Sequence, residues 1–490
     1  MMKNSAVIFF DEGIKESDTL ISGRKSYDMI EDALLKSSFD GEIFYSVPDD
    51  FSLVIEGKKI IKRSKDKYDG WISLFEETSS DNIIKIFADS PFIDSEIISE
   101  MLTIHTEYLA EFTYSENLPS GLACEIFSSE LIKMLPKTDE NILHISDVVK
   151  KNINNFDVEL YYKAPDLRDK RISFRLKNKR DKEIMERMIV DGKFPAYSEI
   201  KDIIESNPEI LYIAPSYYEI ELTGKRNFSS ITSVYPSLKD KRGDMPVSLL
   251  EKIIKSADEF AHDYAVSFSG SGDPLNHSDF FKACDTALES SFLSMLIVET
   301  DAVFSDEALF DYLSSKKDKR IKIIAEINGY DSETYSKVHA FSNFETAHKN
   351  ILRLKEILGK ESVYIQIQKI KETETFLDKY YDFWEKEDFQ IILMKQNTYL
   401  GLLEDRKYYD LSPIERTPCW HLQRDLFILA DGRVPFCRQD IEPKSADSIS
   451  ENSLIEIWNK RKKNFIDNYK KDYPAVPDCS LCDEWYSFFN

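Results

Sequence analysis

Short apolar runs alternate with segments of helical periodicity along the first part of the chain. Unbroken apolar runs predict buried strands over 6–11, 42–46 and 83–88. Apolar residues spaced by three and four positions predict helices over 26–37, 94–108 and 128–135. Because this alternation is typical of a mainly parallel sheet covered by helices, we expect an α/β domain over residues 1–205.

A second and more regular series of strand–helix units begins near Leu211. Apolar runs predict its strands, at 211–222, 264–269, 294–299, 322–327, 362–368 and 389–394. Helical patterns lie between them, at 247–260, 279–289, 306–314, 344–358 and 372–385. Such a series suggests a barrel or part of one, with its site at the carboxyl ends of the strands. We therefore expect a partial (β/α)6 barrel over residues 206–410.

The last segment, residues 411–490, differs in its cysteine content and predicts a small third domain. It holds four of the six cysteines in the chain, Cys419, Cys437, Cys479 and Cys482. Six cysteines in 490 residues do not make a disulfide framework, and a reducing compartment favours metal binding instead. We therefore interpret these four as candidate metal ligands.

The spacing of the four cysteines indicates how they could converge. Cys479 and Cys482 form a C-x2-C pair, which can hold one centre from a single turn. Cys419 and Cys437 flank a predicted hairpin of 427–430 and 433–436, turned at Asp431-Gly432, which would bring them together. Four thiolates suit either a tetrahedral zinc ion or an iron–sulfur cubane, and the spacing leaves both open, as well as four unligated thiols.

Composition and charge narrow the classes of partner. An apolar fraction of 42% suffices for large cores and excludes wholesale disorder. The net charge of −24 repels phosphate backbones, so we do not expect nucleic acid as a general partner. No apolar run reaches the length of about 18 residues that a membrane helix needs, so we expect no membrane insertion and a cytoplasmic protein.

The cysteine segment resembles a known iron–sulfur module. Its residues 418–420, 428–437, Asp440, 456–458 and 479–485 resemble the SPASM domain, which follows many radical S-adenosylmethionine (SAM) enzymes and carries auxiliary [4Fe–4S] clusters. The resemblance implies one [4Fe–4S] cluster held by the four cysteines, with zinc as the alternative. His421, beside Cys419, could be a ligand, tune the centre or simply pack.

The middle series resembles a radical SAM barrel that lacks its own cluster motif. Residues 219–236 resemble the end of the first strand and the cluster loop of that family. The three cysteine positions of the loop fall here on Arg226, Ser230 and Ser233, which provide no thiolate. The resemblance therefore implies that SAM is not cleaved. The whole layout resembles the spiro-SPASM family of spirochaete proteins, in which the tail is kept and the usual cluster motif is missing.

A glycine-rich segment after the second barrel strand carries the remaining cofactor prediction. Residues 269–275 resemble the G-G-E-P segment of the radical SAM family, which contacts the amino end of SAM. The resemblance places Gly270, Gly272 and Asp273 at that position. Glycine-rich loops are common at strand ends, so an ordinary turn is the alternative.

The amino-terminal domain resembles sugar-activating cytidylyltransferases at 86–94 and 118–127. The resemblance implies that Asp89 holds Mg²⁺, whereas the alternative is that Asp89 and Asp94 cap the following helix. Two departures argue against turnover. Residues 11–18 are acidic where the family has a basic phosphate loop, and Arg175 stands near the family's late metal-binding Asp.

Three functions follow from these patterns. The leading hypothesis is an iron–sulfur protein related to radical SAM enzymes, without SAM cleavage, that binds a sugar nucleotide, a peptide or a partner protein. The second is a nucleotidyltransferase of surface-sugar biosynthesis, and the third is a non-catalytic scaffold. No residue is predicted to be catalytic.

Overall fold

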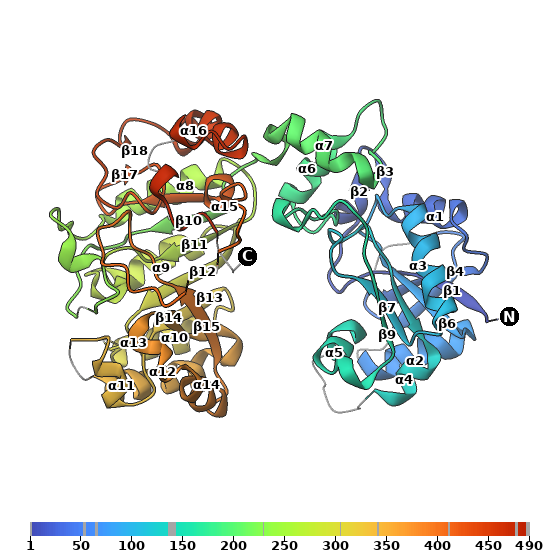
Figure 1. Ribbon diagram of the computed structural model, residues 1–490, viewed down its shortest axis with the longest axis horizontal. Coiled ribbons are helices and arrows are strands. Elements are labelled where there is room, and N and C mark those ends of the chain that lie inside the picture. Colours follow the sequence, from blue (N-terminus) through green and yellow to red (C-terminus); the bar gives the residue numbers. More distant parts are fainter. Residues whose placement is uncertain are drawn as a thin grey trace. The chain divides into compact units, whose positions relative to one another are not determined.

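The computed structural model describes residues 2–51, 55–63, 67–135, 144–228, 230–303, 305–340, 343–409, 412–475 and 479–486. The chain divides into two compact units, Met1–Leu211 and Tyr212–Asn490, each with its own sheet (Figure 1). The boundary predicted between residues 410 and 411 falls outside the described residues.

A seven-stranded sheet in the order β5-β4-β1-β6-β8-β7-β9 forms the first unit. The strands from β5 to β6 are parallel, β8 runs antiparallel to both of its neighbours, and β9 is parallel to β7. The sheet is therefore mainly parallel on one side, as predicted. Its strands are β1 (Asn4–Phe9), β4 (Glu42–Pro48), β5 (Ile60–Arg63), β6 (Asn82–Phe87), β7 (Phe112–Ser115), β8 (Glu125–Ser128) and β9 (Val158–Tyr161).

The predicted helices of the first unit are present, and side chains at their first turns fix where two of them begin. The carboxylate of Asp94 accepts from the backbone N–H of Glu96 and of Ile97, which satisfies two free donors at the start of α3. Ser128 caps α4 in the same way. The helices are α1 (Ser26–Lys36), α2 (Lys67–Thr78), α3 (Ser95–Glu107), α4 (Ser129–Met134), α5 (Ile145–Lys151), α6 (Lys179–Met188) and α7 (Tyr197–Ser206), and β2 (Leu20–Ile21) pairs with β3 (Arg24–Lys25).

His105 of α3 is buried against the sheet and makes the first unit sensitive to acid. Its ring nitrogens lie 2.9 Å from Thr113 Oγ1 and 3.2 Å from Asn82 Oδ1, and burial lowers its pKa from 6.5 to about 4. The unfolded chain therefore takes up a proton at a higher pH than the folded unit does. The contribution of neutral His105 to the free energy of unfolding is fully present above pH 6.5, and this contribution falls by about 3 kcal/mol between pH 6.5 and 4.

Urea unfolding at a series of pH values checks this expectation. The His105→Gln variant should be less stable at neutral pH but should lose less stability than the wild type on acidification. Burial also lowers the pKa of His144 to about 4, so part of the slope should remain in the variant. An unchanged slope would contradict the assignment to His105.

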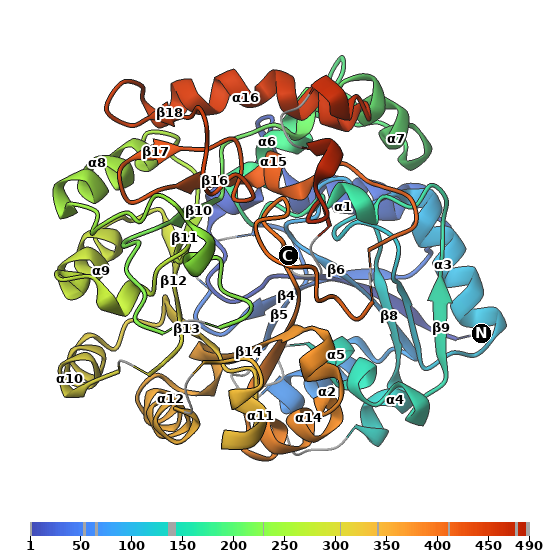
Figure 2. The same cartoon turned by 60° about the vertical axis from the view of Figure 1, so that its left-hand side comes forward.

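Seven parallel strands form the sheet of the second unit, in the order β15-β14-β13-β12-β11-β10-β16. Six of them, β10 to β15, match the predicted series, which confirms a partial barrel. Helices α8, α9, α10 and α12 lie on the outer side of these strands (Figure 2). The strands are β10 (Tyr217–Ile220), β11 (Tyr264–Phe268), β12 (Leu293–Thr300), β13 (Ile321–Glu326), β14 (Val363–Lys369), β15 (Gln390–Lys395) and β16 (Asp425–Ile428).

The helices of this unit agree with the predicted ranges except for the last one. The single helix predicted over 372–385 is two helices, α13 and α14. Thr373 Oγ1 accepts from Ile370 N at 3.0 Å in a capping box that starts α13, and the break follows at Phe376, whose backbone is not helical, with φ −132° and ψ 12°. The helices are α8 (Val247–Asp258), α9 (Phe280–Leu288), α10 (Glu307–Lys316), α11 (Ser332–Ser336), α12 (Phe344–Leu358), α13 (Lys371–Glu374) and α14 (Leu377–Lys386).

Of two further predictions about this unit, the first was wrong and the second holds only in part. The first strand is shorter than 211–222, because 208–211 is a 3-10 helix and Pro215 lacks a backbone N–H for strand pairing. The hairpin of 427–430 and 433–436 forms only at its turn, where Leu429 N donates to Arg433 O at 2.9 Å and Gly432 N donates to Leu429 O at 2.8 Å. Beyond the turn, β16 pairs in parallel with β10, while β17 (Arg433–Val434) pairs with β18 (Asp447–Ser448).

The cysteine segment therefore packs against the barrel rather than standing apart from it. Ala430 N donates to Glu221 Oε2 at 3.1 Å, and Glu221 also pairs with Arg242. Helix α16 (Leu454–Tyr469) brings Trp458 onto Tyr212, with ring centroids 4.5 Å apart. Among the described residues, none of the helices combines the length and the apolar character needed to cross a lipid bilayer.

Candidate metal centre and related sites

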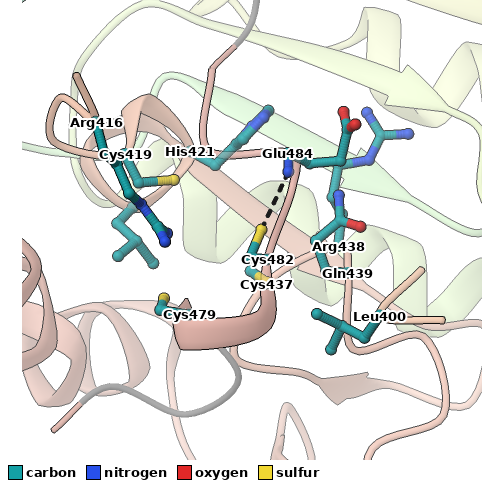
Figure 3. Close-up of a pocket in the computed structure, with 11 residues that line it drawn as sticks. Leu400, Arg416, Cys419, His421, Cys437, Arg438, Gln439, Cys479, Cys482 and Glu484 are labelled. Atoms are coloured by element: carbon teal, nitrogen blue, oxygen red, sulfur yellow. Dashed lines mark hydrogen bonds between the residues drawn. The ribbon is translucent and has the colours of Figure 1, made fainter. Parts of the chain in front are cut away.

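The four predicted cysteines line one cavity (Figure 3). Cys419 lies at the start of α15 (Trp420–Arg424), Cys437 follows β17, and Cys479 opens a 3-10 turn that ends at Leu481, one residue before Cys482. Cys482 Sγ accepts from the backbone N–H of Glu484 at 3.3 Å. Three separate segments thus bring four sulfur atoms to the same space.

Burial controls the protonation of these thiols. It raises the pKa of Cys419, Cys437 and Cys479 to about 12 each, and it also raises the pKa of Cys482. The four thiols are therefore protonated at neutral pH in the absence of a metal. Because thiolates are the ligands that metals bind, loading this centre would release their protons.

Hydrogen-bond donors surround the same cavity. Arg416 and Gln439 line it, and Nε and Nη2 of Arg416 and Nε2 of Gln439 have no hydrogen-bond partner among the described residues. The Arg416 guanidinium lies 4.1 Å from the ring centroid of Tyr473. Buried N–H groups of this kind suit a negatively charged sulfur centre, because they would donate to its sulfur atoms.

His421 also lines the cavity, but a carboxylate holds its ring. Its Nδ1 lies 2.5 Å from Asp425 Oδ2. Burial would raise the pKa of Asp425, but Arg424 and His421 lower it to about 2. This pairing leaves Nε2 as the ring nitrogen that remains for the cavity.

The four thiols do not converge on a single point. Within the described ranges, no three side chains of His, Cys, Asp or Glu lie close enough together to hold one metal ion. A zinc ion draws its four sulfurs to within about 2.3 Å of one centre, whereas a cubane spreads them over four separate irons. The four cysteines supply the donor set of either centre.

Polar side chains connect this centre to the barrel. Arg438, next to Cys437, places Nη2 3.3 Å from Glu219 Oε1 on β10. Lys395, at the end of β15, lies 3.5 Å from Glu484 and donates to Asp483 O. The two residues that follow Cys482 are thus tied to the last barrel strand. The sequence patterns did not predict that Arg416, Arg438, Gln439 and Glu484 belong to this site. Three of them, Arg438, Gln439 and Glu484, lie within two residues of a cysteine, which was the available signal.

The barrel loop that aligns with the radical SAM cysteines holds an ion pair. Arg226 Nη2 lies 2.5 Å from Asp301 Oδ1 and 4.0 Å from Glu326 Oε2. Ser230 is buried and bonds through its hydroxyl to Thr232 Oγ1 at 2.6 Å. Arg226 and Ser233 line a cavity at the carboxyl ends of the strands, whereas Ser230 does not line it. The loop offers this cavity a guanidinium and hydroxyls, and no thiol.

Two glycines of the glycine-rich segment line the barrel cavity, whereas Asp273 bonds to neighbouring residues. Gly270 and Gly272 line the barrel cavity. A Cβ on Gly272 would lie 2.1 Å from Thr223 O, so glycine is needed for the close approach of two backbones. The Asp273 carboxylate accepts from Leu275 N, Thr300 Oγ1 and Asp301 N, and Asp273 does not line the cavity.

In the first unit, Asp89 is paired with an arginine. Arg175 Nε donates to Asp89 Oδ1 at 2.7 Å, and Arg175 Nη2 donates to Asp11 Oδ2 at 2.6 Å. The side chain of Arg175 is only 3% exposed. Burial raises the pKa of Asp89, although Arg175 opposes this shift. The guanidinium of Arg175 thus lies between Asp89, the predicted Mg²⁺ ligand, and Asp11.

Residues 419–483 match the family model of SPASM, an iron–sulfur cluster-binding domain. An uncharacterized protein of Treponema pallidum is 27% identical over 357 residues, 70% of this chain and 98% of that protein. The spore coat polysaccharide biosynthesis protein SpsF of Bacillus subtilis is 26% identical over 78 residues, 16% of this chain and 32% of its own length.

Solved structures with similar parts come from two groups. A cytidylyltransferase from Leptospira borgpetersenii is 19% identical, with a TM-score of 0.38, over 43% of this chain and 97% of that one. anSMEcpe with bound AdoMet is 15% identical, with a TM-score of 0.43, over 55% of this chain and 88% of that one. The predicted α/β fold class is confirmed, with a mainly parallel sheet in the first unit, a partial parallel barrel in the second, and a match to the SPASM model over residues 419–483.

Proposed function

We propose that this chain is an iron–sulfur protein in which one [4Fe–4S] cluster binds Cys419, Cys437, Cys479 and Cys482 and in which the barrel does not cleave SAM. The observation that carries the proposal is that four thiols from three segments line one cavity. The match of residues 419–483 to an iron–sulfur cluster-binding family supports it. The description of that family favours a cluster over zinc, and four thiolates suit a cubane.

A bound cluster would supply a one-electron redox centre and a four-point anchor for the tail. The chain itself contributes charge and hydrogen bonds around that centre. Arg416 and Gln439 would donate N–H groups to sulfur, and Arg438 would add positive charge on the side that faces the barrel. His421, held by Asp425, would keep its ring in a fixed orientation beside Cys419.

The loss of SAM cleavage rests on the barrel loop. A radical SAM centre needs three thiolates, and this loop presents Arg226, Ser230 and Ser233 instead. Neither a guanidinium nor a hydroxyl replaces a thiolate at iron. The ion pair between Arg226 and Asp301 supports the proposal that this loop holds no cluster, because the carboxylate of Asp301 balances the charge of the arginine.

The same reasoning applies to the first unit. We propose that it does not catalyse nucleotidyl transfer through a divalent cation, because the Arg175 guanidinium already pairs with both Asp89 and Asp11. The function that we propose for the edge of the sheet in the first unit is therefore ligand binding without turnover. The lined cavity in the barrel favours ligand binding over a purely structural scaffold for the second unit.

Metal analysis of the full chain tests the cluster. Protein purified without oxygen and reconstituted with iron and sulfide should hold about four iron and four sulfide per chain, with the visible absorption of a cubane. A sample incubated with zinc serves as the control. Tight stoichiometric zinc with no retained sulfide, or folded protein that stays free of metal, would contradict the proposal.

SAM cleavage is measured on the same samples. The reconstituted protein, reduced with dithionite, should release no 5′-deoxyadenosine from SAM above the level of a blank without protein. Steady formation of that product would overturn the barrel half of the proposal and leave the cluster half intact.

A further inference from the structure

Three basic side chains line the cysteine cavity, and one of them has no carboxylate partner in the described part of the chain. Arg438 lies 3.3 Å from Glu219, and His421 lies 2.5 Å from Asp425. Arg416 pairs with no carboxylate of the described ranges, and its Nε and Nη2 have no hydrogen-bond partner there. Because a half-buried guanidinium without a counter-ion is costly, Arg416 needs an anion at close range.

The position of Arg416 directs its charge at the cysteines. Two aromatic rings hold the guanidinium, with ring centroids 4.1 Å away for Tyr473 and 5.8 Å away for Trp485. In Figure 3 the guanidinium end of the side chain points toward Cys479. Burial raises the pKa of Cys479 and of Cys482, and the positive charge of Arg416 opposes this rise in both. The anion that Arg416 is placed to meet is therefore the group of cysteine thiolates with whatever centre they hold.

We propose that Arg416 is the counter-ion of the cluster and stabilises its reduced state. The inference rests on the proposed function, because a zinc ion has no reduced state to stabilise. An electron from a one-electron donor adds one negative charge to the cluster, and no bond to the protein breaks. A cation at close range stabilises the more negative state more strongly than the less negative one, so Arg416 raises the reduction potential.

The other polar groups on the cavity wall are less suited to this role. The side chain of Gln439 carries no net charge, and the charges of Arg438 and His421 are already shared with carboxylates. The carboxylate of Glu484, which also lines the cavity, lies 3.5 Å from Lys395. The loss of Arg416 should therefore change the electrostatic potential at the cluster more than the loss of any of these groups.

Redox titration of the full-length reconstituted protein tests the inference. Wild type and Arg416→Gln are poised with dithionite and redox mediators at the midpoint potential of the wild type. Electron paramagnetic resonance then counts the reduced clusters against total iron. The ratio of reduced to oxidised cluster should be at least tenfold lower in Arg416→Gln, which corresponds to a shift of about 59 mV for a one-electron couple. An unchanged ratio would overturn the inference.

Arg416→Lys separates the charge of this side chain from its packing. Lysine keeps the positive charge but loses the planar group that lies over Tyr473. Its ratio of reduced to oxidised cluster should lie closer to that of the wild type than to that of Arg416→Gln. Equal shifts in the two variants would show that charge is not the cause. If Arg416→Gln holds no cluster, full loading of Arg416→Lys supports the inference, and loss of the cluster in both variants refutes it.

The matched control is Arg433→Gln, which removes the same charge from the same segment of the chain. Arg433 does not line the cavity, and its guanidinium pairs with Asp240 and Asp431, each at 2.7 Å. This variant should titrate like the wild type, and a shift as large as that of Arg416→Gln would contradict the assignment. A wild type without iron and sulfide would overturn the proposed function and the inference together. Normal wild-type content with no shift in Arg416→Gln would overturn the inference alone.

Discussion

Replacing Cys437 by alanine should abolish stoichiometric iron and sulfide binding. A cubane with three thiolate ligands loses one protein bond, and the fourth iron becomes exposed to solvent. Under the proposed function, the bonds to the cluster would also stabilise the tail, because bonds to metal replace much of a core in a small domain. Iron and sulfide analysis after desalting should therefore fall from about four of each per chain to a small fraction.

The same loss should loosen the tail and leave the barrel folded. Hydrogen exchange of the segments around Cys419, Cys437 and Cys479 should rise to the level of exposed loops, while β11 to β14 stay protected. Cys284→Ala is the control, because Cys284 is buried in α9 and does not line the cysteine cavity. Full metal content in Cys437→Ala, or equal loss in Cys284→Ala, would refute the assigned ligands.

Sequence patterns were sufficient for the strands and insufficient for the way distant segments meet. Each strand from β11 to β15 consists mainly of apolar residues within one short segment, so the local pattern of apolar residues was enough to locate it. The apolar run that becomes β16 was predicted as half of a hairpin, and the turn of that hairpin forms, but no ladder continues from it. Its partner is β10, about two hundred positions earlier, and only tertiary packing decides that pairing.

The same limit applies to the candidate sites. The spacing of Cys479 and Cys482 located a ligand pair, but nothing local places Cys419 and Cys437 around the same cavity. The family resemblances indicated that Arg226 and Arg175 stand at or near positions where a residue that binds metal was expected. The resemblances could not show that Asp301 and Asp89 are the partners of these arginines, because each pair joins residues far apart in the chain.

The two units have a common feature at these positions. In each, the family resemblance aligns an arginine with or near a metal ligand, and the guanidinium of that arginine pairs with carboxylates: Arg226 with Asp301, and Arg175 with Asp89 and Asp11. Buried carboxylates without a counter-ion are costly, so loss of a metal creates a need for another cation. An internal guanidinium meets that need without a bound ion.

Removing the internal cation should therefore both destabilise the first unit and restore a response to divalent ions. Arg175→Ala removes the arginine partner of Asp89 and of Asp11, although His144 Nε2 still lies 3.9 Å from Asp11 Oδ1. This loss should cost about 3–5 kcal/mol and lower the first unfolding transition by about 10 °C. Because the pKa of Asp89 should rise further without Arg175, its neutral form becomes favoured in the folded unit, and the deficit relative to wild type should shrink as pH falls. Calorimetry with millimolar Mg²⁺ or Mn²⁺ should recover part of the loss in the variant and change nothing in the wild type.

Arg168→Ala is the control, because its pair with Asp166 is exposed and should contribute less than about 1 kcal/mol. A wild type that Mg²⁺ stabilises as strongly as the variant would show that Arg175 does not replace a metal ion.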